Sequence, residues 1–374
     1  MKKFICFSLL ALSLLGANSA SALDQAACTY KDLRIKLGPV RNQGDVGWCY
    51  ANTAADLLTA HFKLKSEGFM SAVQLAMIYN FSYEDSLNSE GGDIAQTLKL
   101  ALRNPRSNES SSELLKFGYC PNSLEQEAMT IGPKTSLRTK IARLNELKKL
   151  YDEGKANPIK KKSFWDLYLG YKSQGSILIK IPEVTFLNAL ERSTPSNFLL
   201  KFADIICGDA RYYNEKTDIM VIKHGKVVNA TYTYNQGPSC SKKFEFNLLP
   251  EIHRELNNER IIGVGFNSSL IEMGGSLDKD SIGHAAVILG RQWKNGSCQV
   301  LMRNSWGTAC DFQDEKGRKF SRYSKYVQEC DQGNLWLKEQ DLEKAISSMT
   351  YIVNGTDLFP QQIPPPEVNQ CRAP

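Results

Sequence analysis

The chain has 374 residues and a net charge of +6, with 42% hydrophobic and 23% charged residues. These values are ordinary for a globular protein. The positive charge is too small to indicate a nucleic acid or an anionic membrane as a partner. We expect the one basic run, Lys160-Lys161-Lys162, to be a solvated loop.

Residues 1–22 have the layout of a cleaved secretory signal. Two lysines precede an apolar run at residues 4–15, and Ala20-Ser21-Ala22 offers the small residues of a cleavage site. The apolar run is shorter than the roughly 18 residues that a membrane span requires. We therefore expect cleavage near Ala22, a secreted or periplasmic location, and no membrane anchor.

Beyond the signal, apolar residues recur at helical spacing directly after Cys49, and similar patterns predict helices near residues 73–78, 94–102 and 137–147. Runs rich in β-branched residues follow and predict antiparallel strands. These runs lie at residues 176–182, 219–228, 261–266, 285–289 and 300–303. Helices followed by strands indicate an α+β fold in a single domain of residues 23–358. The proline-rich tail, residues 359–374, is predicted to be extended.

Ten cysteines are present, and Cys6 leaves with the signal. The remaining nine suggest one free thiol among paired ones, in an oxidising compartment. If Cys49 is the free thiol, eight cysteines remain, and their pairing is left open by the sequence: Cys28, Cys120, Cys207, Cys240, Cys298, Cys310, Cys330 and Cys371. The chain has no C-x-x-C motif and its four histidines are scattered, so we expect neither a zinc site nor another metal or cofactor.

Cys49 lies in the first turn of its predicted helix, where backbone N–H groups and the helix dipole favour a thiolate. Far downstream, His284 lies in a predicted strand and Asn304 follows another. Each of these residues alone is more typical of a structural role. A thiol, an imidazole and an amide in this order, however, are the three parts of a cysteine-nucleophile site.

Residues 43–51, which read Gln-Gly-Asp-Val-Gly-Trp-Cys-Tyr-Ala, resemble the nucleophile segment of papain-like cysteine peptidases. Gly283-His284-Ala285 resembles the strand that carries the base in that family. Asn304-Ser305-Trp306-Gly307 matches the family's asparagine motif, and Gly91-Gly92 resembles the glycine pair that lines the substrate cleft.

This resemblance implies a two-lobe fold with a helical N-terminal lobe and a β-rich C-terminal lobe. It also implies a monomeric endopeptidase that acts on peptides or proteins. Cys49 would be the nucleophile, His284 the general base and acid, and Asn304 the residue that orients the imidazole. Gln43 would bind the oxyanion. The residues expected to contact the substrate are Gly47, Trp48, Gly91, Gly92 and Trp306.

The sequence also departs from the family pattern. Val46 replaces a cysteine, and Trp48 replaces a small residue and is expected to narrow the cleft. The long spacing between Cys49 and His284 predicts an insertion within residues 121–258, and a second insertion is predicted at residues 310–330. Two alternatives stay open: an inert papain-like module that binds peptides or proteins, and an acyl-transferring or cell-wall amidase that uses the same triad.

Overall fold

We describe the fold from a computed structural model, which covers residues 25–63, 69–83, 91–102, 119–120, 137–173, 178, 181–195, 197–207, 217–223, 228–232, 240–244, 248–277, 283–313 and 318–354. The predicted signal and the predicted proline-rich tail both lie outside these residues. None of the helices in this part of the chain is both long and apolar enough to cross a bilayer.

The centre of the molecule is an eight-stranded sheet with the order β12-β13-β9-β8-β7-β14-β4, to which β1 adds beside β8. Every pairing in it is antiparallel. Its strands are β1 Lys31–Asp32, β4 Thr217–Lys223, β7 Ile262–Asn267, β8 Gly283–Lys294, β9 Ser297–Arg303, β12 Val327–Asp331, β13 Asn334–Lys338 and β14 Ile346–Asn354. Three short two-stranded pairs accompany it: β2 Phe69–Met70 with β3 Tyr119–Cys120, β5 Val228–Tyr232 with β6 Cys240–Phe244, and β10 Asp311–Gln313 with β11 Lys319–Ser321.

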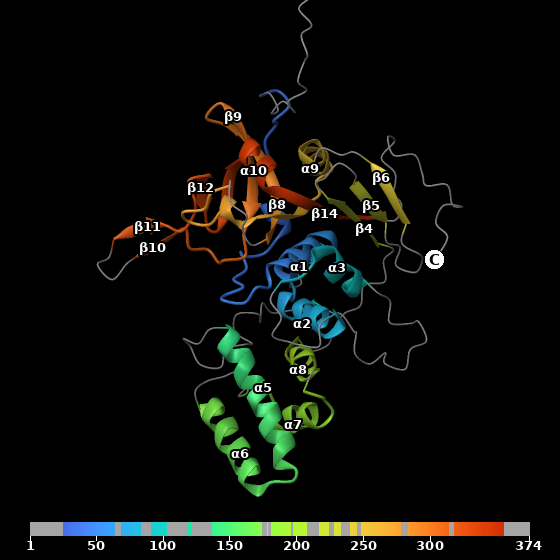
Figure 1. Ribbon diagram of the computed structural model, residues 1–374, viewed down its shortest axis with the longest axis vertical. Coiled ribbons are helices and arrows are strands. Elements are labelled where there is room, and N and C mark those ends of the chain that lie inside the picture. The colour runs from blue at the N-terminus through green and yellow to red at the C-terminus, as the bar shows by residue number, and fades with distance from the viewer. Residues whose placement is uncertain are drawn as a thin grey trace, which may run out of the picture.

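Helices precede and flank this sheet, so the predicted α+β class, with helical and antiparallel β-rich parts, is confirmed (Figure 1). The helices are α1 Cys49–His61, α2 Ala72–Tyr83, α3 Ile94–Leu102, α5 Leu137–Gly154, α6 Pro158–Ser173, α7 Glu183–Glu191, α8 Phe198–Cys207, α9 Leu248–Asn257 and α10 Glu339–Ala345, with the short 3-10 helices η1 Arg34–Lys36 and η4 Ser268–Leu270.

Helix α1 lies between the N-terminal helices and the central sheet, because it packs against α2 and α3 and also against β7, β8 and β14. Gly263 on β7 allows this close approach. A Cβ atom there would lie 2.9 Å from Thr53 Cγ2 and 3.0 Å from Leu57 Cδ1, both on α1. Helix α9 packs against the same three strands, and Figure 1 shows it on the other side of them.

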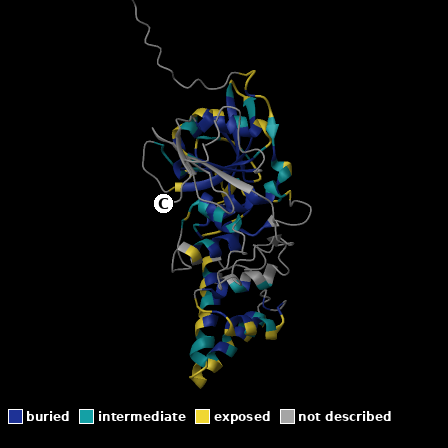
Figure 2. Cartoon of the chain, turned by 90° about the vertical axis from the view of Figure 1, so that its right-hand side faces the viewer, coloured by how far each residue is buried: buried dark blue, intermediate teal, exposed yellow. Residues whose placement is uncertain are grey.

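The predicted insertion within residues 121–258 contains a helical extension, α5 to α8 (Figure 1). It contacts the rest of the molecule where α8 packs against α2 and where Arg138 at the start of α5 binds Asp45. Stacked aromatic rings form its interior: Phe164 on Tyr168, and Tyr168 on Phe186. Buried residues concentrate around the sheet and α1, while the extension shows exposed residues along its outer surface (Figure 2).

Two sequence predictions in this insertion are corrected. The expected strand at residues 176–182 is wrong within the described residues, since Leu178 lies in a 3-10 turn and α7 begins at Glu183. The apolar side chains described there, those of Leu178 and Ile181, are buried in the hydrophobic core. The lysine run is exposed as expected, but it belongs to α6.

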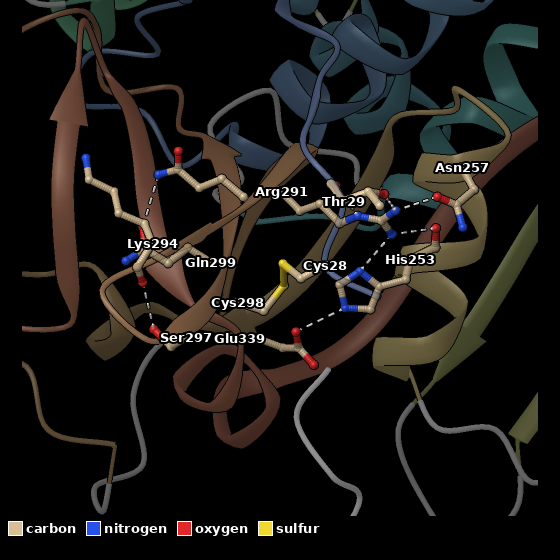
Figure 3. Close-up of a disulfide and its surroundings, with 11 residues drawn as sticks. Cys28, Thr29, His253, Asn257, Arg291, Lys294, Ser297, Cys298, Gln299 and Glu339 are labelled. Carbon is tan, nitrogen blue, oxygen red and sulfur yellow. Dashed lines mark hydrogen bonds and ion pairs between the residues drawn. A yellow bond between two sulfur atoms is a disulfide. The ribbon is translucent and has the colours of Figure 1, made fainter. Parts of the chain in front are cut away.

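A disulfide between Cys28 and Cys298 fastens the segment before β1 to β9, and a second disulfide joins Cys310 to Cys330. Arg291, which is 1% exposed, reinforces the first attachment (Figure 3). Its guanidinium donates to the backbone oxygen of Thr29 at 2.8 Å and faces His253 Nδ1 at 3.2 Å. The other ring nitrogen of His253, Nε2, lies 3.1 Å from the carboxylate of Glu339.

Asp56 on α1 forms buried ion pairs with two arginines from separate segments. Its Oδ1 lies 2.7 Å from Arg41 Nε, and its Oδ2 lies 2.9 Å from Arg303 Nε. The three side chains, which we call the Asp56 cluster, are 7%, 8% and 4% exposed. Arg303 also donates to the carbonyl oxygens of Gly38 and Pro39. The cluster therefore joins α1, the chain before it and the end of β9.

We predict that Asp56→Asn lowers the free energy of unfolding by about 3–5 kcal/mol, because both arginines lose their buried counter-charge. Chemical denaturation would measure this. Asp166→Asn is the matched control: Asp166 pairs with Lys162 on the surface with side chains 62% and 77% exposed, and its loss should cost about 0.5 kcal/mol or less. Equal small effects for the two variants would contradict a structural role for the cluster.

Candidate active site

The Cys49 thiol lies at the first residue of α1 and is the free cysteine among the described residues, as predicted. Its sulfur is within hydrogen-bonding reach of three backbone groups: that of Ala285 on β8, and those of Tyr50 and Cys49 at the helix N-terminus. The contact with Ala285 brings α1 and β8 together beside His284. The structure thus places the thiol against the strand residue that follows His284, although 235 positions separate Cys49 from His284 in the chain.

His284 and Asn304 form a direct hydrogen bond, with 2.9 Å between His284 Nε2 and Asn304 Oδ1. Asn304 is completely buried and follows β9, the strand that pairs with β8. The side-chain oxygen of Asn304, Oδ1, also accepts a hydrogen bond from the backbone N–H of Ser305 at 2.8 Å. This second bond identifies which end of the side-chain amide is the oxygen. Because Nε2 donates to Asn304, Nδ1 is the ring nitrogen left for the thiol.

Two aromatic rings contact the imidazole. Phe266, its cross-strand neighbour on β7, makes an edge contact at 5.4 Å between ring centroids. Trp306 lies 5.1 Å away and in turn stacks on Tyr323 at 6.2 Å. These apolar contacts restrict the ring's rotation and exclude water from the bond to Asn304.

Gln43 is brought to the same place by pairing between its own segment and the asparagine motif. Its backbone N–H donates to the Ser305 carbonyl at 2.7 Å, and the Gly307 N–H donates to the Arg41 carbonyl at 2.9 Å. Ser305 Oγ donates to Gln43 Oε1 at 2.5 Å, while Gln43 Nε2 donates to the Val46 carbonyl at 3.0 Å. The second hydrogen on Nε2 remains available for a ligand.

The glycine pair is attached to the nucleophile loop by a bond from Gly91 N–H to the Gly47 carbonyl at 3.0 Å. Gly91 has a φ of 97°, which favours glycine. Gly92 is required by packing, since a Cβ atom there would lie 2.7 Å from the Tyr50 ring. Both glycines thus lie beside the segment that carries Cys49.

The position of Trp48 differs from our expectation. We predicted that its indole narrows a cleft, but the side chain is 2% exposed and packs in the core. Its ring is the largest apolar group at the start of α1, and burying it removes that surface from water. By contrast, Trp306 is partly exposed at the site, as a substrate contact requires.

The sequence reasoning did not single out Ser305, Tyr323 or the Asp56 cluster. Ser305 sets the orientation of the Gln43 amide. Tyr323 covers Trp306 and faces Asn304. Arg41 and Arg303 lie two residues before Gln43 and one before Asn304. The only hint in the sequence is that a basic residue lies close to each of these two polar residues. Nothing in the sequence indicates that both arginines bind the same carboxylate, Asp56 on α1.

Burial opposes both charges of a thiolate–imidazolium pair. Burial raises the pKa of the Cys49 thiol, while the three backbone contacts lower it. Burial also lowers the pKa of His284, while the bond to Asn304 and the negative charge of Glu272 raise it. In both groups burial outweighs the polar contacts, so the pKa of the thiol is raised, the pKa of the imidazole is lowered, and the neutral forms of both groups are favoured.

We predict that Asn304→Ala lowers the pKa of His284 further, because the lost acceptor binds the charged ring more strongly than the neutral one. Glu272→Gln should lower it too, by less. The ring's NMR shifts against pH would report this, with His284→Gln identifying the signal. Asn188→Ala on the exposed face of α7 is the control and should change nothing. A rise in the pKa of His284 in the Asn304→Ala variant would contradict the hydrogen bond between His284 and Asn304.

Comparisons with known proteins give structural likeness only. No family model and no curated protein matches the sequence. A solved structure described for antibody cross-reactivity between the mite allergens Blo t 1 and Der p 1 is 11% identical, with a TM-score of 0.41 over 90% of this chain and 73% of that chain. PepW from Lactobacillus rhamnosis is 12% identical, with a TM-score of 0.33 over 87% and 82%. Digestive procathepsin L 3 from the larval midgut of Tenebrio molitor is 10% identical, with a TM-score of 0.37 over 89% and 73%. The functional assignment therefore depends on the geometry of the site itself.

Proposed function

We propose that this chain is a papain-like thiol endopeptidase that hydrolyses peptide bonds through an acyl-enzyme on Cys49. One observation carries the proposal. His284 on β8 forms a hydrogen bond of 2.9 Å with Asn304, which follows the paired strand β9. The next residue of β8, Ala285, has its backbone against the Cys49 sulfur. A thiol, an oriented imidazole and the amide that orients it are the elements of a Cys-His-Asn site.

In the proposed reaction, Cys49 transfers its proton to His284 Nδ1 and its sulfur attacks the substrate carbonyl carbon. The backbone N–H of Cys49 and the free hydrogen of Gln43 Nε2 bind the oxygen as it becomes negative. His284 then gives its proton to the leaving amine, and the acyl group stays on the sulfur. A water molecule, deprotonated by the same imidazole, releases the acid and restores the thiol.

Substrate contacts are proposed for the groups that remain exposed beside this chemistry. Gly91 and Trp306 are partly exposed, and Gly47 is fixed to Gly91 through its carbonyl. A substrate backbone that pairs with the glycine segment would present its carbonyl to Cys49. Trp306 would lie under the leaving group, since it contacts the imidazole that protonates that group. We propose that the enzyme acts as a monomer.

We also propose that the protein is exported, with its signal removed near Ala22. The disulfides Cys28–Cys298 and Cys310–Cys330 support an oxidising compartment. Cys49 must nevertheless stay reduced, because an oxidised sulfur cannot attack a carbonyl.

The test of this function is turnover of a fluorogenic peptide under mild reduction. We expect Cys49→Ala and His284→Ala to abolish turnover, because each removes a group that bonds to the reacting atoms. Gln43→Ala should lower kcat by about 10²–10³-fold through the lost oxyanion contact.

Asp166→Asn, which changes only an exposed pair on α6, is the control and should leave the rate unchanged. Turnover that survives Cys49→Ala would overturn the proposal. Peptide binding without turnover in the unmodified protein would indicate an inert binding module instead. Release of cell-wall fragments or ligated products, with proteins left intact, would indicate an amidase or acyl transferase.

A further inference from the structure

The insertion between Cys310 and Cys330 carries a hairpin, β10 and β11, that projects away from the central sheet (Figure 1). Strands β10 and β11 pair antiparallel, with Phe312 opposite Phe320. All six residues of these two strands are exposed. The disulfide closes the base of the insertion, so the hairpin is anchored although its strands contribute nothing to the core.

The hairpin presents a pair of stacked aromatic side chains to solvent. Phe312 and Phe320 are 41% and 38% exposed. Their ring centroids lie 5.5 Å apart with 20° between the planes, and the Arg318 guanidinium lies over Phe320 at 5.5 Å. Exposed large aromatic side chains supported by a rigid strand pair are typical of surfaces that bind another protein.

This surface is continuous with the candidate catalytic residues. The returning chain runs from Phe320 to Tyr323, which stacks on Trp306. Arg322 holds its guanidinium 5.9 Å from the centre of the Trp306 ring. Because Trp306 contacts the imidazole that protonates the leaving amine, the hairpin lies on the leaving-group side. Arg322 and Phe320 are two residues apart, or about 7 Å along an extended strand.

The returning chain is also basic. Its described part, residues 318–325, contains four lysines and arginines and no acidic residue, while the paired strand β10 carries one acidic residue, Asp311. Lys319 and Lys325 are exposed, and Arg322 is partly exposed. A segment of opposite charge that also carries apolar side chains would complement both features of this surface.

We propose that the hairpin is an exosite for protein substrates and binds the stretch that follows the scissile bond. It selects stretches in which acidic residues alternate with apolar ones. The acidic groups pair with the basic returning chain, and the apolar groups pack on Phe312 and Phe320. This inference rests on the proposed peptidase function, which it extends to substrate choice.

The experiment compares two quenched peptides that are identical up to the scissile bond. After it, one carries glutamate and phenylalanine, and the other carries glutamine and serine. A third substrate has only a fluorogenic amine after the bond. The variants are Phe312→Ser with Phe320→Ser, and Lys319→Glu. The control is Ile159→Ser with Val184→Ser, which removes two exposed apolar side chains, 75% and 66% exposed, from the helical extension.

We expect the hairpin variants to reduce kcat/KM for the acidic peptide about tenfold, mainly by raising KM. The values of kcat/KM for the other two substrates should stay unchanged. The same changes in a Cys49→Ala background should weaken binding of the acidic peptide, measured by fluorescence anisotropy, by a similar factor. Thermal unfolding would verify that the variants are folded.

The binding measurement separates the two proposals. One outcome is that the unmodified chain hydrolyses no substrate while the hairpin variants lose binding of the acidic peptide. That result would contradict the peptidase function but support the binding surface on the hairpin. Normal hydrolysis with equal affinity for both quenched peptides, or equal losses in the hairpin variants and the control, would overturn the exosite.

Discussion

The arrangement of the site depends on the two ion pairs of Asp56. This carboxylate lies seven positions after Cys49, about two turns along α1 and on the same face of the helix. It binds one arginine from the segment of Gln43 and another from the end of β9, next to Asn304. The helix that carries the thiol is thereby fixed to the two segments that carry Gln43 and Asn304. Each charge is buried, so the three groups are stable only together.

The chemistry of the site follows from the same burial. An environment that excludes water strengthens every polar contact in it, and it also disfavours an isolated thiolate or imidazolium. The backbone groups at the helix N-terminus and at Ala285 offset part of this cost for Cys49, and Asn304 and Glu272 offset part of it for His284. These polar groups are held in place by the fold, so they need no rearrangement if charge develops on the sulfur or on the imidazole.

The insertions surround this arrangement without interrupting it. The helical extension has its own aromatic interior, yet its helix α5 reaches the nucleophile loop, where the Arg138 guanidinium donates to the Asp45 carbonyl at 2.9 Å. The hairpin at residues 310–330 contacts the site from the opposite end of the chain, through Tyr323 and Trp306. Both insertions add surface beside the candidate site.

The local elements and the chemical identity of the site were determined by the sequence. The period of apolar residues predicted α1, α2, α3 and α5, and β-branched runs predicted β7, β8 and β9, because these patterns depend only on which side of an element faces the core. Of the residues in the predicted motifs, His284 and Asn304 are hydrogen-bonded to each other, and the backbone of Ala285 contacts Cys49. Their catalytic roles stay predictions.

Only the tertiary structure decided what depends on contacts between distant segments. It buried Trp48, paired Cys28 with Cys298, and gave Arg41 and Arg303 a common carboxylate. Residues near an active position are equally compatible with a cleft wall or with the core until the opposing layer is placed. An ion pair between remote segments leaves no periodic pattern, because its partners meet through the path of the chain and not through their spacing in it.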